Sequence, residues 1–97
     1  MEELVRFVTF RPLEGREGEL RELITNQALE INRRFGALRI WCLSGDEGMA
    51  IVSVWARPDD LDTMRADGEY IALLAEIRAR SRDLTDRRYR LIAGSSP

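Results

Sequence analysis

Four strand-like runs alternate with two helical stretches along this sequence, and that order constrains the fold more than any other feature. The runs either alternate apolar and polar residues or are apolar throughout, and turn-forming residues separate them. The strands are predicted at residues 4–10, 37–43, 49–57 and 87–93. The order β-α-β-β-α-β predicts a ferredoxin-like α+β fold, in which an antiparallel four-stranded sheet carries its helices on one face.

The first helical stretch begins near Glu14, after Pro12, and is predicted to end at Gly36. Its apolar residues recur with a period near 3.6, which is typical of an amphipathic helix lying on a sheet. The stripe consists of Leu20, Leu23, Ile24, Ala28, Ile31 and Phe35. Gln27 falls inside this stripe, so its amide is expected to face the sheet.

The second helical stretch begins at Pro58 and is expected to break near Gly68. A short helix would precede the break, and a longer one over residues 69–82 would follow it. Tyr70 leads the apolar stripe of the longer helix, so its ring is expected to face the sheet as well.

Residues 37–43 and 49–57 are joined by a short, glycine-bearing loop, which predicts a hairpin. Alternation separates aliphatic positions from mixed aromatic and polar positions on each strand. The aliphatic rows are Leu38, Ile40 and Cys42, and Ala50, Val52, Val54 and Ala56; the mixed rows are Arg39 and Trp41, and Met49, Ile51, Ser53 and Trp55. We expect the two aliphatic rows to share a face, an arrangement that a shift of one residue in register would change.

The predicted sheet is apolar on both faces, whereas the chain supplies helices for only one of them. A chain of 97 residues is expected to form one domain, residues 1–97, and to bury roughly 60 to 65% of its unfolded surface. Such a core is marginal, and an uncovered aliphatic sheet face needs a partner. The sequence therefore predicts an obligate homodimer, a dimeric α+β barrel.

The basic residues restrict the chemistry of the chain. All 15 are arginine, and the sequence contains neither lysine nor histidine. Schiff-base catalysis, histidine-based triads, histidine general-base catalysis and histidine ligation of metal or haem are therefore excluded for the lone chain. Cys42 is the single cysteine. Within its apolar run it is expected to be an inert thiol, and it cannot form the thiol pair of a metallochaperone.

Charge and hydropathy argue against two kinds of partner. The formal net charge is −2 with both signs interspersed, so no basic surface for nucleic acid is expected. No apolar run approaches the ~18 residues of a membrane helix, so no membrane partner is expected. The first residues are acidic, unlike a secretory signal, which favours a cytoplasmic location.

Two segments resemble the antibiotic biosynthesis monooxygenase family of dimeric α+β barrels. One is FVTFRPLEGREGEL at residues 7–20, a strand leading into a helix start with proline, glycine and acidic residues. The other is VSVWARP at residues 52–58, in which a tryptophan closes the third strand. The resemblance spans nearly the whole chain. It implies that two protomers pack sheet to sheet and that each keeps a pocket between its own sheet and helices.

Two branches of that family differ in their site residues. Haem-degrading members use an Asn, a Trp and an axial His, and the matching positions hold Val8, Met64 and Leu74, so haem degradation is not expected. Cofactor-independent oxygenases act on phenolic or quinol substrates with a Trp and an Asn on the third strand. Trp55 is similar to that Trp, whereas Ile51 stands at the Asn position. The resemblance implies an oxidoreductase, a monooxygenase that uses no cofactor and no metal.

The candidate site residues follow from the chemistry of such an oxygenase. A deprotonated aromatic substrate can itself donate an electron to O2, so the protein must only bind it, exclude water and stabilise the anion. Candidate catalytic residues are Trp55, Tyr70 and Arg39, and candidate substrate-binding residues are Trp41, Gln27, Ser53 and Arg57. Arginines 39 or 57 would hold the phenolate, the two tryptophans would stack on rings, and Tyr70 or Gln27 would orient oxygen substituents.

Two other functions remain open. Ile51, where a polar group is expected, favours a non-catalytic dimeric barrel that binds a small ligand or a partner protein. An isomerase, cyclase or decarboxylase on the same scaffold would instead use Asp62, Asp67 or Glu69, with Tyr70 as the second acid or base.

Overall fold

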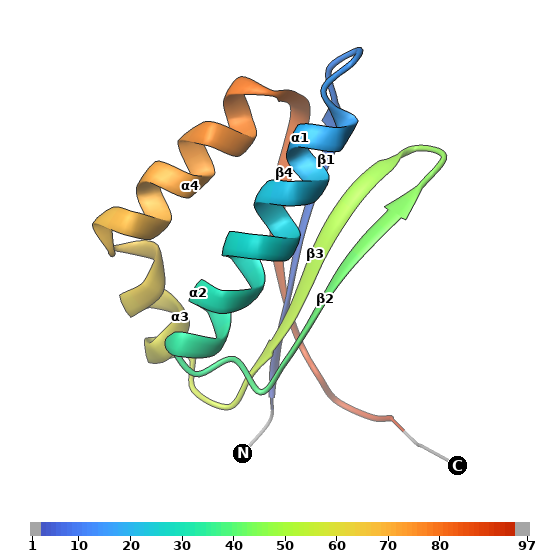
Figure 1. Ribbon diagram of the computed structural model, residues 1–97. Coiled ribbons are helices and arrows are strands. Elements are labelled where there is room, and N and C mark those ends of the chain that lie inside the picture. Colours follow the sequence, from blue (N-terminus) through green and yellow to red (C-terminus); the bar gives the residue numbers. More distant parts are fainter. Residues whose placement is uncertain (1–2, 95–97) are drawn as a thin grey trace.

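In the computed structural model, which describes residues 3–94, a four-stranded antiparallel sheet carries its helices on one face (Figure 1). The strands are β1 (Leu4–Pro12), β2 (Arg39–Gly45), β3 (Gly48–Trp55) and β4 (Ser81–Arg90). They lie in the order β2-β3-β1-β4, so β3 and β1 are central. The predicted ferredoxin-like arrangement is confirmed.

The first helical segment consists of α1 (Glu17–Leu23), the π-helix η1 (Ile24–Ala28) and α2 (Leu29–Arg34). At the end of η1 the backbone N–H of Leu29 donates to the carbonyl of Ile24, five residues earlier. This wider turn rotates the chain less per residue, so the side chains around it point differently than in an unbroken α-helix. Gln27 is exposed and Asn32 is buried. The expectation that Gln27 faces the sheet is therefore wrong.

The second helical segment is broken close to where the sequence predicts, into α3 (Pro58–Arg65) and α4 (Gly68–Ala79). Asp67 begins α4 as its N-cap, because its Oδ2 accepts the backbone N–H groups of Glu69 and Tyr70 at 3.0 and 3.2 Å. The helix ends earlier than predicted, and β4 begins at Ser81 rather than at Arg87. Charged residues fill much of β4, which hides the alternation that identifies a strand.

The hairpin of β2 and β3 has a register that reverses one expectation. Trp41 pairs with Val52, and Cys42 pairs with Ile51. The aliphatic row of each strand therefore lies beside the mixed row of the other, and the expectation that the aliphatic rows share a face is wrong. The short turn between the strands sets this register, since one residue more or less would exchange the faces.

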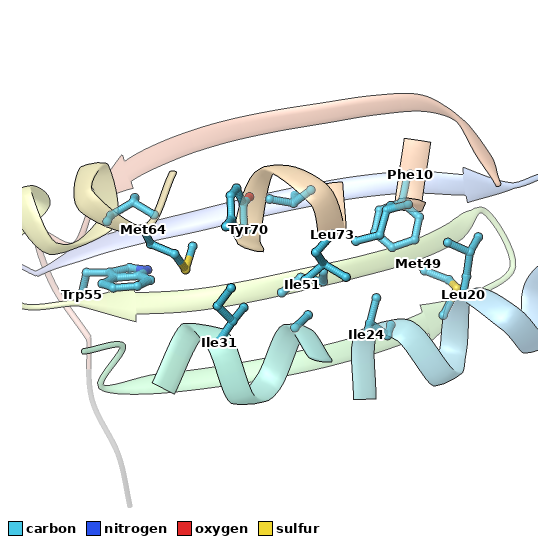
Figure 2. Packing of buried hydrophobic residues seen from close by; sticks show 14 residues of the cluster. Phe10, Leu20, Ile24, Ile31, Met49, Ile51, Trp55, Met64, Tyr70 and Leu73 are labelled. Atoms are coloured by element: carbon cyan, nitrogen blue, oxygen red, sulfur yellow. The ribbon is translucent and has the colours of Figure 1, made fainter. Parts of the chain in front are cut away.

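The core lies between the helices and the face of the sheet that they cover, here named the covered face. Figure 2 shows Trp55 and Met64 toward one end of this layer, and Phe10, Leu20 and Met49 toward the other. All five are at most 4% exposed. The strands add Val8 and Ile51 to this layer, and the helices add Ile24, Ala28, Ile31, Leu61, Tyr70, Leu73 and Ile77.

Within residues 3–94, no helix or strand packs on the opposite face of the sheet, here named the open face (Figure 1). Its exposed apolar side chains are Phe7, Trp41, Leu43 and Tyr89, which are 37 to 50% exposed. Val52 lies on the same face but is 7% exposed, because its partners in the sheet, Phe7 and Trp41, are larger and flank it. The described residues thus leave an apolar sheet face uncovered, as the sequence predicts. None of the described helices has the length and apolar character needed to cross a membrane.

Candidate functional site

A small cavity lies between the covered face and the helices. Its volume is about 20 Å³, which is room for about one water molecule. Its polar lining residues come from four parts of the fold: Arg6 from β1, Ser53 from β3, Asn32 from the first helical segment and Tyr70 from the second. Each of these four is at most 6% exposed. The apolar lining residues are Val8, Ala28, Ile51, Leu73, Leu74 and Ile77.

Arg6 carries a charge into this apolar layer, and Asp86 on β4 balances it. The Nε and Nη2 atoms of Arg6 donate to Oδ1 and Oδ2 of Asp86 at 2.9 and 2.8 Å. Burial alone would lower the pKa of Arg6 and raise the pKa of Asp86. The hydrogen bonds and opposite charges outweigh burial in both groups, so the pKa of Arg6 is raised and the pKa of Asp86 is lowered. Both side chains are therefore charged at neutral pH.

Tyr70 connects this ion pair to the cavity. Its hydroxyl oxygen accepts a hydrogen bond of 2.7 Å from Nη2 of Arg6. A tyrosine oxygen that accepts in this way retains its own hydrogen for another group. Donation from a cation also polarises the hydroxyl and makes it a stronger donor. Tyr70 can therefore donate to an oxygen atom in the cavity.

Ser53 and Trp55 form a second polar contact on the covered face. The Nε1 atom of Trp55 donates to Oγ of Ser53 at 2.9 Å, and both residues are buried. This bond satisfies the indole of Trp55 and leaves the Ser53 hydroxyl hydrogen for a second partner. Trp55 thus holds Ser53 in place at the cavity wall.

Asn32 presents an acceptor that nothing in residues 3–94 satisfies. Its Nδ2 donates to the carbonyl oxygen of Ala28 at 2.7 Å, whereas its buried Oδ1 has no hydrogen-bond partner among the described residues. An unsatisfied buried acceptor costs about 1–3 kcal/mol. Because an amide oxygen can only accept, a molecule in this cavity must offer it a donor.

The structure brings three of the seven predicted site residues together. Trp55, Tyr70 and Ser53 lie on the covered face, at or beside the cavity. The others lie away from it: Arg39 and Trp41 on the open face, Gln27 on the exposed side of η1, and Arg57 exposed before α3. Roles for these four residues remain predictions, and the cavity gives them no support.

The carboxylates considered for acid-base chemistry do not meet Tyr70 in the cavity. Asp62 accepts from Nη2 of Arg88 at 2.8 Å, Asp67 caps α4, and Glu69 forms an ion pair with Arg34. None of these carboxylates lines the cavity. Their contacts are those of surface ion pairs and a helix cap.

No protein-family model and no curated protein matches the sequence. A Caulobacter crescentus protein named as a candidate antibiotic biosynthesis monooxygenase matches the structure with a TM-score of 0.82 and 12% identity, over 95% of this chain and 92% of that one. SnoaB from Streptomyces nogalater, a cofactor-independent oxygenase, matches with a TM-score of 0.74 and 18% identity, over 99% and 97%. The chain has the antibiotic biosynthesis monooxygenase fold.

A third structure supports this conclusion about the fold. A Chloroflexus aurantiacus protein, also named as a candidate antibiotic biosynthesis monooxygenase, has a TM-score of 0.76 and 14% identity, over 97% of both chains. The TM-scores of these structures establish the monooxygenase fold. Because the identities are low, the chemistry has to be argued from the residues of the cavity.

Sequence reasoning missed two residues that the monooxygenase fold brings to its cavity. Arg6 shares the covered face with Val8 and Phe10, and strict alternation along β1 could have placed it in the core. Asn32 gave no comparable signal, because its inward orientation depends on the π-turn before it.

Proposed function

We propose that the protein is a cofactor-independent monooxygenase that oxidises a small hydroxylated aromatic substrate, such as a phenol, a quinol or a polyketide-like ring. The observation that carries this proposal is the buried polar set of Arg6, Asn32, Ser53 and Tyr70 around one cavity of the covered face. The fold shared with SnoaB, a cofactor-independent oxygenase, supports the same class of reaction.

The chemistry of such a substrate balances without a reductant. When O2 converts a phenol to a quinone, one oxygen atom enters the ring and the other leaves as water. The ring gives up as many electrons as O2 takes, and the hydroxyl and ring hydrogens leave in that water. The protein must then supply binding, exclusion of bulk water and stabilisation of developing charge.

Tyr70 is the residue placed to stabilise that charge. As the substrate gives electrons to O2 and its hydroxyl proton moves to the reduced oxygen, partial negative charge grows on the hydroxyl oxygen, and a donor aimed at that oxygen binds the transition state more strongly than the ground state. Arg6 polarises the Tyr70 hydroxyl, and Asp86 keeps Arg6 charged and oriented. Arg6 and Asp86 are therefore positioning residues.

The ring of a substrate needs more room than the closed cavity offers. Small-molecule pockets typically measure about 300–1,000 Å³, far more than the volume between sheet and helices here. Leu74 is the one lining residue that is only half-buried, whereas its neighbours Leu73 and Ile77 on α4 are buried. We infer that a ring enters by displacement of the Leu74 side chain.

We also propose that the open face pairs with the same face of a second copy. Exposed aromatic side chains such as Phe7, Trp41 and Tyr89 are the residues that anchor protein interfaces. A permanent interface of this kind commonly removes ~2,000 Å² or more of surface in total. Assembly would then use one face of the sheet, and catalysis the other.

Oxygen uptake and incorporation of ¹⁸O2 test the proposed reaction against a panel of phenols and quinols. We expect one labelled oxygen atom in the product, and a kcat/KM about 100-fold lower in Tyr70→Phe. Tyr89→Phe is the matched control, because it removes the same hydroxyl from the open face, and it should keep wild-type activity. Absence of oxygen uptake across the panel would contradict the proposal.

A second candidate function is a ligand-binding barrel without catalysis. The small volume of the cavity, and the absence of a carboxylate among its lining residues, favour it. Saturable binding of a phenol without any oxygen uptake would support this function and remove the oxygenase.

A further inference from the structure

The hydrogen-bonding pattern of the cavity specifies its occupant more closely than its size does. Asn32 is 3% exposed, and its Oδ1 requires a donor. Tyr70 and Ser53 each accept one hydrogen bond from a neighbouring side chain and each retain a hydrogen to donate. The lining therefore offers one acceptor and two donors within a space of about 20 Å³.

We propose that this cavity is a subsite for a single hydroxyl group, which donates its hydrogen to Oδ1 of Asn32 and accepts a hydrogen bond from Tyr70. The assignment extends the proposed function. It rests on that function only in taking the rest of the ligand to be an aromatic ring. Asn32 becomes a specificity-determining residue for hydroxylated rings.

Other oxygen and nitrogen groups match this lining less well. An ether or a carbonyl can accept from Tyr70 but cannot donate to Asn32, so Oδ1 stays unsatisfied at a cost of about 1–3 kcal/mol. An ammonium group can donate but would bring a second cation next to Arg6. A phenolate has no hydrogen to donate, so its lone pairs would face Oδ1 of Asn32. Arg6 would not offset the negative charge of the phenolate, because Asp86 already balances Arg6. A hydroxyl group both donates and accepts at one atom, and it is about the size of the space.

The π-turn explains why Asn32 is available for this role. Residues 24–28 form the wider turn. In the helix that follows it, the side chains of Ile31 and Asn32 point toward the sheet. The bond from Nδ2 of Asn32 to the Ala28 carbonyl fixes the amide so that Oδ1 is the atom left without a partner. Local π-turns occur frequently at functional sites.

Anaerobic calorimetry with two probes of similar size tests the subsite. Phenol carries the hydroxyl group, and toluene carries a methyl group in its place. We expect the wild-type protein to bind phenol at least about tenfold more tightly than toluene. In Asn32→Leu this preference should disappear or reverse. Asn26→Leu, the same substitution at an exposed position of η1, is the matched control and should keep the preference.

Two further readouts separate loss of recognition from loss of folding. Asn32→Leu removes an unsatisfied buried acceptor, so its melting temperature should equal or exceed that of the wild type. Tyr70→Phe keeps the ring in place and should lower phenol affinity about tenfold while leaving toluene affinity unchanged. A wild type that binds toluene as tightly as phenol, or an Asn32→Leu protein that still prefers phenol, would overturn the subsite.

The absence of O2 from this experiment keeps the two proposals separable. Selective binding of phenol by a protein that never consumes O2 would remove the oxygenase and support the subsite. Oxygen uptake by a protein that does not distinguish phenol from toluene would support the oxygenase and remove the subsite.

Discussion

The two tryptophans of this chain stand on opposite faces of one sheet, and their surroundings differ. Trp55 is 0% exposed, and its indole holds Ser53 at the wall of the cavity. Trp41 is 45% exposed on a face that no described element covers. In our proposals, the same residue type therefore supports a site on the covered face and offers a contact for assembly on the open face. The face of the sheet, rather than the residue type, separates the two roles.

The arginines repeat this comparison. Arg6 on the covered face is 3% exposed and engages both Asp86 and Tyr70. Arg39 on the open face is exposed, although its sequence made it a catalytic candidate. Substitutions on the two faces should consequently have different effects.

The largest effect is expected from Arg6→Met. Removal of the guanidinium leaves a partly buried carboxylate on Asp86 and a buried hydroxyl on Tyr70 without their donor. We expect the free energy of unfolding to fall by about 3–5 kcal/mol, measured by urea denaturation. Arg88→Met is the control, since it breaks a more exposed ion pair with Asp62 and should cost less than about 1 kcal/mol. Equal losses in the two variants would show that burial adds nothing to the strength of the Arg6–Asp86 ion pair.

A smaller effect, on assembly alone, is expected from Trp41→Ala. Truncation of an interface aromatic residue commonly costs about 1 kcal/mol or more, and a homodimer carries the substitution twice, so the dimer should weaken roughly 30-fold. Sedimentation equilibrium measures the dissociation constant. Ile71→Ala removes an apolar side chain that is also exposed, but on α4, and should leave the dimer intact. A wild-type protein that sediments as a monomer at micromolar concentration would refute the assigned role of the open face.

The smallest effect on stability is expected when the pH is lowered. The pKa of Asp86 lies below its usual value of 3.8 in the folded protein, because Arg6 outweighs the effect of burial. Its contribution to stability is therefore complete above the pKa of the unfolded chain and is lost as the pH falls through the lower folded value. The urea midpoint should decline over this acid range, and it should decline less steeply in Asp86→Asn. Identical profiles for the two proteins would mean that this carboxylate is not linked to folding.

The parts of the fold that depend on local pattern could be predicted from the sequence. Alternation identified β1 and the hairpin, and Gly68 marked the break between the later helices. The parts that depend on one residue more or less could not be predicted. The hairpin register places Trp41 on the open face and Cys42 on the covered face. The π-turn directs Asn32, rather than Gln27, toward the sheet. Propensity does not report either shift, because the length of the hairpin turn decides the first and the wider turn of η1 decides the second.

Our proposals assign small-molecule chemistry to the covered face and assembly to the open face. The indole N–H signals of Trp55 and Trp41 in an NMR spectrum report on these two faces separately. On titration with phenol under nitrogen, we expect the Trp55 signal to shift, because Ser53 lies at the cavity, and the Trp41 signal to stay in place. A shift of the Trp41 signal with an unchanged Trp55 signal would contradict the account.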